Sequence, residues 1–95
     1  MPDRNVVATQ QALKALSKRP LSMAEHHVLW HLAATLPPTG DMVSKAQLQE
    51  ALAITQVHLN AVMRRLCQYG FLIRGPKAGR SYHYKLNPAL LRIIS

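Results

Sequence analysis

Two helix patterns that follow each other with almost no linker constrain this chain more than any other feature. Ser44 opens the first pattern with a capping box. Thr55 is a suitable N-cap for a second and longer pattern, whose apolar residues recur at helical spacing until Gly70. A glycine at that place suits a left-handed helix end. We therefore predict a short helix, a tight turn and a longer helix over residues 44–69.

A hairpin is predicted directly after these helices, over residues 71–86. Residues 71–74 and 81–86 are rich in side chains that favour strands. The turn between them contains two glycines and the cations Lys77 and Arg80. The hairpin should therefore end in a positively charged tip.

Both ends of the chain are predicted to be helical. Residues 5–17 have a helical pattern, and Ser22 with Glu25 is a capping box that opens another helix. Near the other end, an Asn-Pro pair opens a predicted C-terminal helix over residues 88–94. Its apolar residues are Leu90, Leu91, Ile93 and Ile94. They are too apolar to stand in water and must pack on the domain or on a second copy of it.

The length of the chain allows one domain, residues 1–95, without room for a second core. Within it the predicted order is helix, short strand, short helix, tight turn, longer helix, hairpin and helix, which is the anatomy of a winged helix. The expected fold class is therefore mainly α with a small β-hairpin (α+β), in the form of a winged helix-turn-helix.

The DNA-binding core of bacterial MarR-type regulators resembles residues 44–74, SKAQLQEALAITQVHLNAVMRRLCQYGFLIR. The shared pattern is a capped short helix, a small-apolar-Thr turn, a longer helix with regular apolar positions, and a glycine followed by hydrophobic residues and an arginine. The hairpin and the Tyr-x-Leu-Asn-Pro after it are similar to winged-helix plasmid replication proteins. The resemblance covers Ser44 to Pro88 and implies a winged helix that binds DNA.

Charge is distributed unevenly along the chain. The formal net charge is +8, and the four acidic residues all lie at or before Glu50. From Ala51 onward the charged side chains are Arg64, Arg65, Arg74, Lys77, Arg80, Lys85 and Arg92. A half-chain with positive charges only suits a polyanion, because neutralised phosphates release condensed counterions. Double-stranded DNA is therefore the expected partner.

The longer helix is predicted to enter the major groove. If Leu59, Val62 and Leu66 face the core, the opposite face is free for base contacts. The residues expected to contact bases are Gln56, Val57, His58, Asn60, Ala61 and Arg64. The residues expected to contact the DNA backbone are Ser44, Lys45, Thr55, Arg65, Gln68 and Arg74, with Lys77 and Arg80 at the hairpin tip. The resemblance implies that the first turn and a half of this longer helix makes most of the base contacts. Members of the resembled family often have a longer polar side chain at the position of Ala61, so one of the usual base contacts is expected to be missing here.

Few residues are available for catalysis or metal binding. Cys67 is the only cysteine, which excludes an internal disulfide and a cysteine zinc site. His27 and His31 have the spacing of metal ligands on one helix, but no second cluster completes a site. No phosphate loop, nucleophile motif or carboxylate pair occurs, so we expect no enzyme activity and no cofactor. Since no apolar run is long enough to cross a bilayer, we expect no membrane partner and a cytoplasmic, nucleoid-associated protein.

These observations predict a sequence-specific double-stranded DNA-binding protein, above all a small transcriptional repressor. We expect a homodimer through the N-terminal helix and the C-terminal segment, because a single helix specifies only a short target. One open alternative is plasmid or phage replication or maintenance, and another is a winged helix that contacts proteins. Binding of RNA or single strands is disfavoured by the low aromatic content of 5%.

Overall fold

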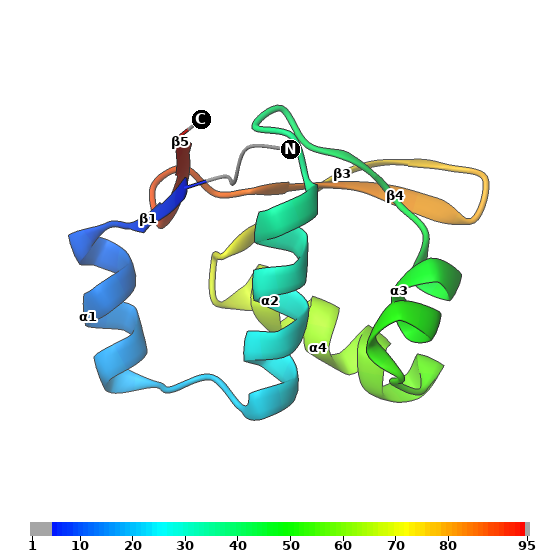
Figure 1. Cartoon of the computed structure of the whole chain (residues 1–95), viewed down its shortest axis with the longest axis horizontal. Helices are drawn as coiled ribbons and strands as arrows, with labels where there is room; N and C mark the ends of the chain where they lie inside the picture. The colour runs from blue at the N-terminus through cyan, green and yellow to red at the C-terminus, as the bar shows by residue number, and fades with distance from the viewer. Residues whose placement is uncertain (1–4, 95) are drawn as a thin grey trace.

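The structure, a computed structural model, describes residues 5–94 and shows within them four helices and five strands (Figure 1). The helices are α1 (Gln10–Lys18), α2 (Met23–Thr35), α3 (Lys45–Leu52) and α4 (Gln56–Gln68). The strands are β1 (Asn5–Ala8), β2 (Asp41–Val43), β3 (Leu72–Ala78), β4 (Ser81–Leu86) and β5 (Leu91–Ile94). They form two antiparallel sheets, one with the order β2-β4-β3 and one made of β1 and β5.

The fold class predicted from the sequence is wrong. We expected a mainly α winged helix-turn-helix with one small hairpin, but residues 5–94 contain five strands in two sheets. The winged-helix assignment is not confirmed, and the fold is α+β. The physical reason lies at the two ends of the chain, where segments predicted as helices pair with each other as strands.

The predicted helix over residues 5–17 is a strand followed by a shorter helix. Its first four residues are β1, and α1 begins at Gln10 because Thr9 is the N-cap. The hydroxyl of Thr9 accepts a hydrogen bond at 3.3 Å from a backbone N–H of the first turn. Val6 and Val7 are β-branched, so a strand suits them better than a helix does.

The predicted C-terminal helix over residues 88–94 is a single turn followed by β5. The turn starts as a capped helix would, with Ala89 N donating to the side chain of Asn87 at 3.0 Å. It does not continue, because the residues beyond it pair with β1, where Val6 lies opposite Ile93. Strand pairing gives hydrogen-bond partners to backbone N–H and C=O groups of both β1 and β5.

The apolar residues near the C-terminal end are covered by the chain itself. Leu90 and Leu91 are 3% and 2% exposed, and Ile93 packs against the core. Ile94, which was also predicted to form a dimer interface, has a side chain outside the described residues. Leu90, Leu91 and Ile93 are therefore covered within one chain, and their apolar character no longer argues for the homodimer expected through this segment.

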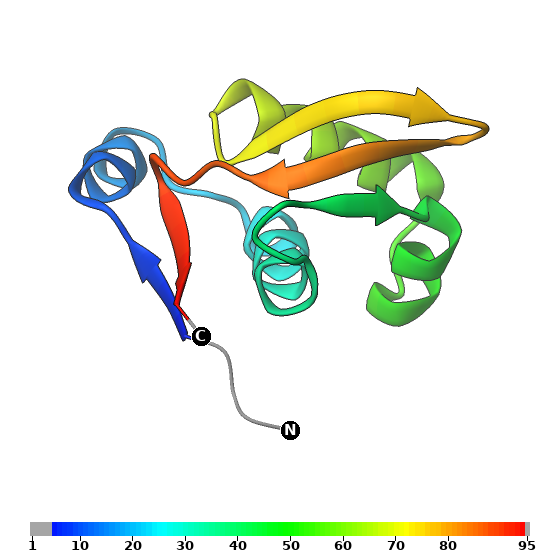
Figure 2. The same cartoon turned by 90° about the horizontal axis from the view of Figure 1, so that it is seen from above.

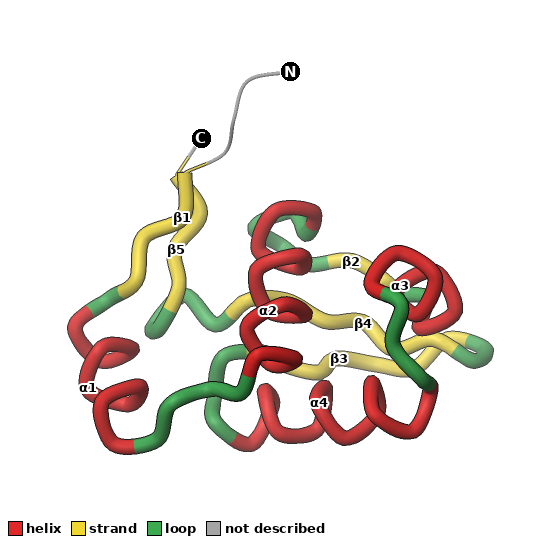
Figure 3. The backbone as a smooth tube through the Cα atoms, turned by 60° about the horizontal axis from the view of Figure 1, so that its bottom comes forward, coloured by secondary structure: helices red, strands yellow, loops and turns green. Residues whose placement is uncertain are grey.

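Helices α2, α3 and α4 cover one face of the three-stranded sheet, and the other face is open (Figure 2). The β1–β5 pair and α1 lie at one end of the molecule, opposite the tip of the β3–β4 hairpin (Figure 1). Helix α4 runs across the direction of α2 and lies next to β3 (Figure 3). The largest fully buried side chains are Phe71, Leu29, Leu32, Leu59, Met63, Leu66, Leu91, Val28 and Val62. None of the helices within residues 5–94 is long and apolar enough to cross a membrane.

Candidate nucleic-acid interface

Helix α4 has one buried side and one side in solvent. The hydroxyl of Thr55, its N-cap, accepts a hydrogen bond from His58 N at 3.2 Å. At the other end Gly70 has a φ of 86°, and Phe71 N donates to Leu66 O at 3.0 Å. The buried residues of the helix are Leu59, Val62, Met63 and Leu66. Both ends and one side of α4 are thus held, which leaves the opposite side free for a partner.

The residues predicted for base contact lie on the side of α4 away from its buried residues, but they border two different hollows of the molecule. Exposed among them are Gln56, Val57, His58, Asn60 and Arg64, whereas Ala61 is half-buried. Asn60 and Arg64 line a groove beside the β3–β4 hairpin. His58 instead lines a hollow toward α2, together with His27. The structure therefore brings together Asn60 and Arg64 and separates His58 from them.

The groove between α4 and the hairpin has a volume of about 540 Å³. Its lining residues are Lys45, Asn60, Met63, Arg64, Cys67, Gln68, Arg74 and Tyr84. Three of these are cations, one each from α3, α4 and β3, and none is acidic. The groove is therefore positively charged, with two amides beside the cations.

The other two titratable residues of the groove, Cys67 and Tyr84, are neutral at pH 7, because their ordinary pKa values of 9.0 and 10.0 lie above it and burial raises both. Burial raises the pKa of the Cys67 thiol, although the nearby Arg74 and Lys45 oppose the rise. Burial also raises the pKa of the Tyr84 hydroxyl, and the nearby Cys67 raises this pKa by a smaller amount. Neither residue supplies a negative charge, so the charge of the three cations is not compensated inside the groove.

The β3–β4 hairpin extends the positive surface beyond the groove. Arg74 Cζ lies 4.7 Å and Lys77 Nζ 5.6 Å from the centroid of the Tyr82 ring. The turn is Gly79-Arg80, in which Gly79 has a φ of 62° and Arg80 is exposed. A positive φ at the first central residue only is the pattern of a type II′ turn. The cations predicted for this hairpin are therefore exposed, and two of them share one aromatic ring.

Three predicted backbone-contacting residues have structural roles. Arg65 Nη1 lies 3.5 Å from Glu25 Oε2, so its guanidinium is directed toward α2. The hydroxyls of Ser44 and Thr55 accept cap hydrogen bonds, that of Ser44 from Gln47 N at 3.3 Å. The sequence contained no signal for the Arg65 ion pair, because its partner is forty positions away on another helix.

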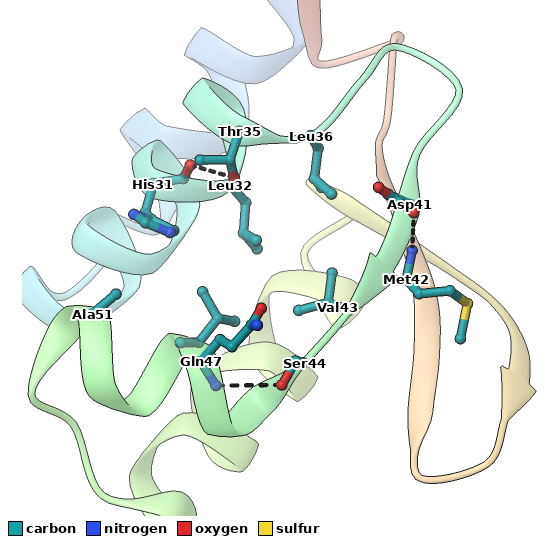
Figure 4. Close-up of a pocket in the computed structure, with 11 residues that line it drawn as sticks. His31, Leu32, Thr35, Leu36, Asp41, Met42, Val43, Ser44, Gln47 and Ala51 are labelled. Carbon is teal, nitrogen blue, oxygen red and sulfur yellow. Dashed lines mark hydrogen bonds between the residues drawn. The ribbon is translucent and has the colours of Figure 1, made fainter.

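A second hollow, of about 300 Å³, lies between α2, β2 and α3 (Figure 4). Its buried apolar lining residues are Leu32, Leu36, Val43 and Leu48. Its charged residue is Asp41, whose carboxylate accepts a hydrogen bond from Met42 N at 2.7 Å. A hollow with a carboxylate and no lysine or arginine does not suit phosphate, so the chemistry of the groove beside the hairpin suits an anion better.

The histidines of α2 do not form a metal site. Within residues 5–94 no group of three or more His, Cys, Asp or Glu side chains is placed to hold a metal ion. His26 stacks on Trp30 and accepts a hydrogen bond from its indole at 3.2 Å. His27 and His31 line two different hollows.

A scan against protein-family models, a search of curated proteins and a search of solved structures each found no match to this chain. Its function is therefore inferred from the chemistry of the groove, the hairpin and α4.

Proposed function

We propose that the chain binds double-stranded DNA, with the exposed side of α4 in the major groove and the neighbouring cations on the phosphate backbone. The groove supports this proposal most directly. The space is surrounded by Lys45, Arg64 and Arg74, which come from three different elements, and none of its lining residues within the described part of the chain is acidic. Cations that converge without compensating acids attract a polyanion, and their binding to phosphates releases counterions.

The shape and side chains of α4 favour a duplex. The helix has 13 residues, and the major groove of B-DNA, about 12 Å wide, admits one helix. Asn60 is suited to adenine and Arg64 to guanine, because each forms two hydrogen bonds with its base. Val57, which is 81% exposed, is suited to a thymine methyl group. We therefore propose Gln56, Val57, Asn60 and Arg64 for base contacts.

The backbone contacts are assigned to the residues around this helix. They are Lys45, Gln68, Arg74, Lys77 and Arg80. Occupying a DNA site is sufficient for repression, so a nucleoid-associated transcriptional repressor is our first proposal for the biological role. The same binding would also serve plasmid or phage replication or maintenance.

Salt-dependent binding to labelled duplexes tests the proposal. We expect the logarithm of the association constant to fall linearly with the logarithm of salt concentration, by about 0.9 for each phosphate contact. Lys45→Ala should lower this slope by about one contact. Lys14→Ala is the matched control, since Lys14 is exposed on α1, away from the groove. Absence of duplex binding at low salt would overturn the proposal, and selection from a random pool of duplexes would give the preferred site.

The exposure of Val57 favours one second candidate, in which α4 contacts a protein. Val57 is 81% exposed, so burying its side chain against an apolar partner surface would stabilise such a complex. Val57→Ser should then abolish capture of that partner, and duplex affinity would be independent of Arg64. Under the DNA proposal Arg64→Ala weakens duplex binding, so the two variants separate the candidates.

A further inference from the structure

Strand β3 contains one extra residue relative to its partner β4. Arg74 pairs with Tyr84, and the next regular pair is Lys77 with Tyr82. Between these two pairs β3 advances by three residues and β4 by two, so the register shifts. The shift is a β-bulge formed by a Gly-Pro pair.

The bulge determines which face of the sheet Lys77 occupies. Side chains alternate between faces along a strand, so residues three apart in a regular strand lie on opposite faces. Residues that pair directly share a face. Tyr82 and Tyr84 are two apart and therefore lie on one face, which is the face of the core because Tyr84 is 3% exposed. Arg74 and Lys77 thus both lie on the side of the sheet that faces α4.

Local packing explains why a Gly-Pro pair forms this bulge. A Cβ on Gly75 would lie 2.9 Å from Nδ1 of His83, the residue between the two paired tyrosines. Pro76 has no N–H group and therefore cannot donate to the ladder, which confines proline to edges and bulges. Gly75, which has no Cβ to clash with His83, and Pro76, which has no N–H group, therefore both suit the bulge.

Tyr82 brings the two cations together. Their charged groups lie 4.7 Å and 5.6 Å from its ring centroid, within the range of about 6 Å for cation–π attraction. The negative face of the ring offsets part of the repulsion between Arg74 and Lys77. One of the pair, Arg74, also lines the groove beside α4.

We propose that the bulge and Tyr82 position Arg74 and Lys77 as one unit that binds adjacent phosphates of a DNA strand. This inference rests on the proposed function, and it adds a positioning role for three residues that do not touch DNA: Gly75, Pro76 and Tyr82. The bulge brings Lys77 onto the side of α4, and the ring holds both cations in place before DNA arrives.

Two deletions change how many residues separate the cations, and so test whether Lys77 must lie on the side of α4 to bind DNA. Deleting Pro76 leaves one residue between Arg74 and Lys77, so regular alternation keeps both on the side of α4. Deleting Gly75 and Pro76 together makes the cations neighbours and moves Lys77 to the open face. Lys77→Ala should lower the salt slope by about one contact in the full chain and in the single deletion, and should have no effect in the double deletion.

Two substitutions test the role of the ring. Tyr82→Phe keeps an aromatic face and should leave duplex affinity within about twofold, whereas Tyr82→Leu should lower affinity about threefold to tenfold without changing the salt slope. A readout without DNA comes from NMR, because methylene protons above a ring shift upfield. That shift at Lys77 should persist in Tyr82→Phe and in the single deletion, and disappear in Tyr82→Leu and in the double deletion.

The outcomes separate this inference from the proposed function. If the full chain binds no duplex, both are overturned. If it binds duplexes but the effect of Lys77→Ala is the same in both deletions, or the upfield shift survives Tyr82→Leu, only the positioning inference is overturned. Thermal unfolding of each variant shows whether the hairpin remains folded. Where a deletion unfolds the chain, the two Tyr82 substitutions test the positioning inference in its place.

Discussion

The carboxylate of Glu25 joins α2 to α4 through Arg65, with Oε2 3.5 Å from Nη1. Glu25 is only 4% exposed, and its Oε1 accepts a hydrogen bond from Ser22 N at 2.9 Å. One carboxylate therefore caps the start of α2 and binds a cation of the helix that crosses it.

This ion pair predicts opposite phenotypes for two neighbouring arginines. Arg65→Ala should lower the free energy of unfolding by about 1–3 kcal/mol, because it leaves a buried carboxylate without its cation. The loss should lie at the lower end, since the Arg65 side chain is 48% exposed. Arg64→Ala should leave stability unchanged and reduce discrimination at one base pair by about 1–3 kcal/mol, because its two-bond contact with guanine is lost. Urea unfolding and fluorescence anisotropy measure the two effects, and a lower salt slope of DNA binding for Arg65→Ala would place Arg65 on DNA.

Base recognition should depend on Asn60 and be independent of His58. Asn60→Ala should reduce discrimination at one base pair by about 1–3 kcal/mol, because a two-bond contact with adenine is lost. His58→Ala is the matched control on the same helix, since His58 lies toward α2. Affinities for a selected duplex and its single-base variants give the comparison. Equal discrimination by the wild type and Asn60→Ala would remove Asn60 from the base contacts.

Two glycines with positive φ should differ in their tolerance of alanine. Gly40 has a φ of 83°, and a Cβ there would lie 2.6 Å from both Lys85 Cβ and Tyr84 O. Gly79 has a φ of 62°, with no atom within 4 Å of its Cβ position. Gly79→Ala should cost about 1–2 kcal/mol for backbone strain alone, and Gly40→Ala about 1–3 kcal/mol more for overpacking. Equal unfolding midpoints for the two variants would contradict the packing described around Gly40.

Stability should decrease in alkaline solution through Cys67 and Tyr84. Burial raises the pKa of both, so the folded chain keeps these protons at a pH where the unfolded chain has lost them. In that range the folded state binds more protons, and stability falls as pH rises. The fall should start near the ordinary thiol value of 9.0 and continue past the ordinary tyrosine value of 10.0.

Serine at position 67 tests the contribution of the thiol, because its hydroxyl does not titrate in this range. Unfolding midpoints measured across alkaline pH should fall less steeply for Cys67→Ser than for the wild type. Tyr84→Phe should flatten the curve at still higher pH. Parallel curves for all three proteins would show that neither group contributes.

The sequence was informative where structure is local. The serine caps at Ser22 and Ser44 are present, and α4 spans Gln56–Gln68, close to the range that its caps and period indicated. These signals act within a few residues, so they can be recognised without knowing the rest of the fold.

The errors arose where structure depends on residues far away. The apolar runs at residues 6–7 and 93–94 fit a short helix or a strand equally, and only their pairing across the chain decides between them. The candidate site shows the same limit. Exposure of Asn60 and Arg64 followed from helical period, whereas the partners of Arg65 and Tyr82 follow from how α2, α4 and the hairpin meet.

The pairing of β1 with β5 also has a kinetic consequence. The nearby hydrogen bond from the Thr9 hydroxyl to Ala89 O joins residues 80 positions apart. Closing so large a loop is entropically costly, so this contact should form after the hairpin and the α2–α4 core during refolding. The small sheet should also open first, and its amide protons should exchange with deuterium before those of β4, well below the free energy of global unfolding.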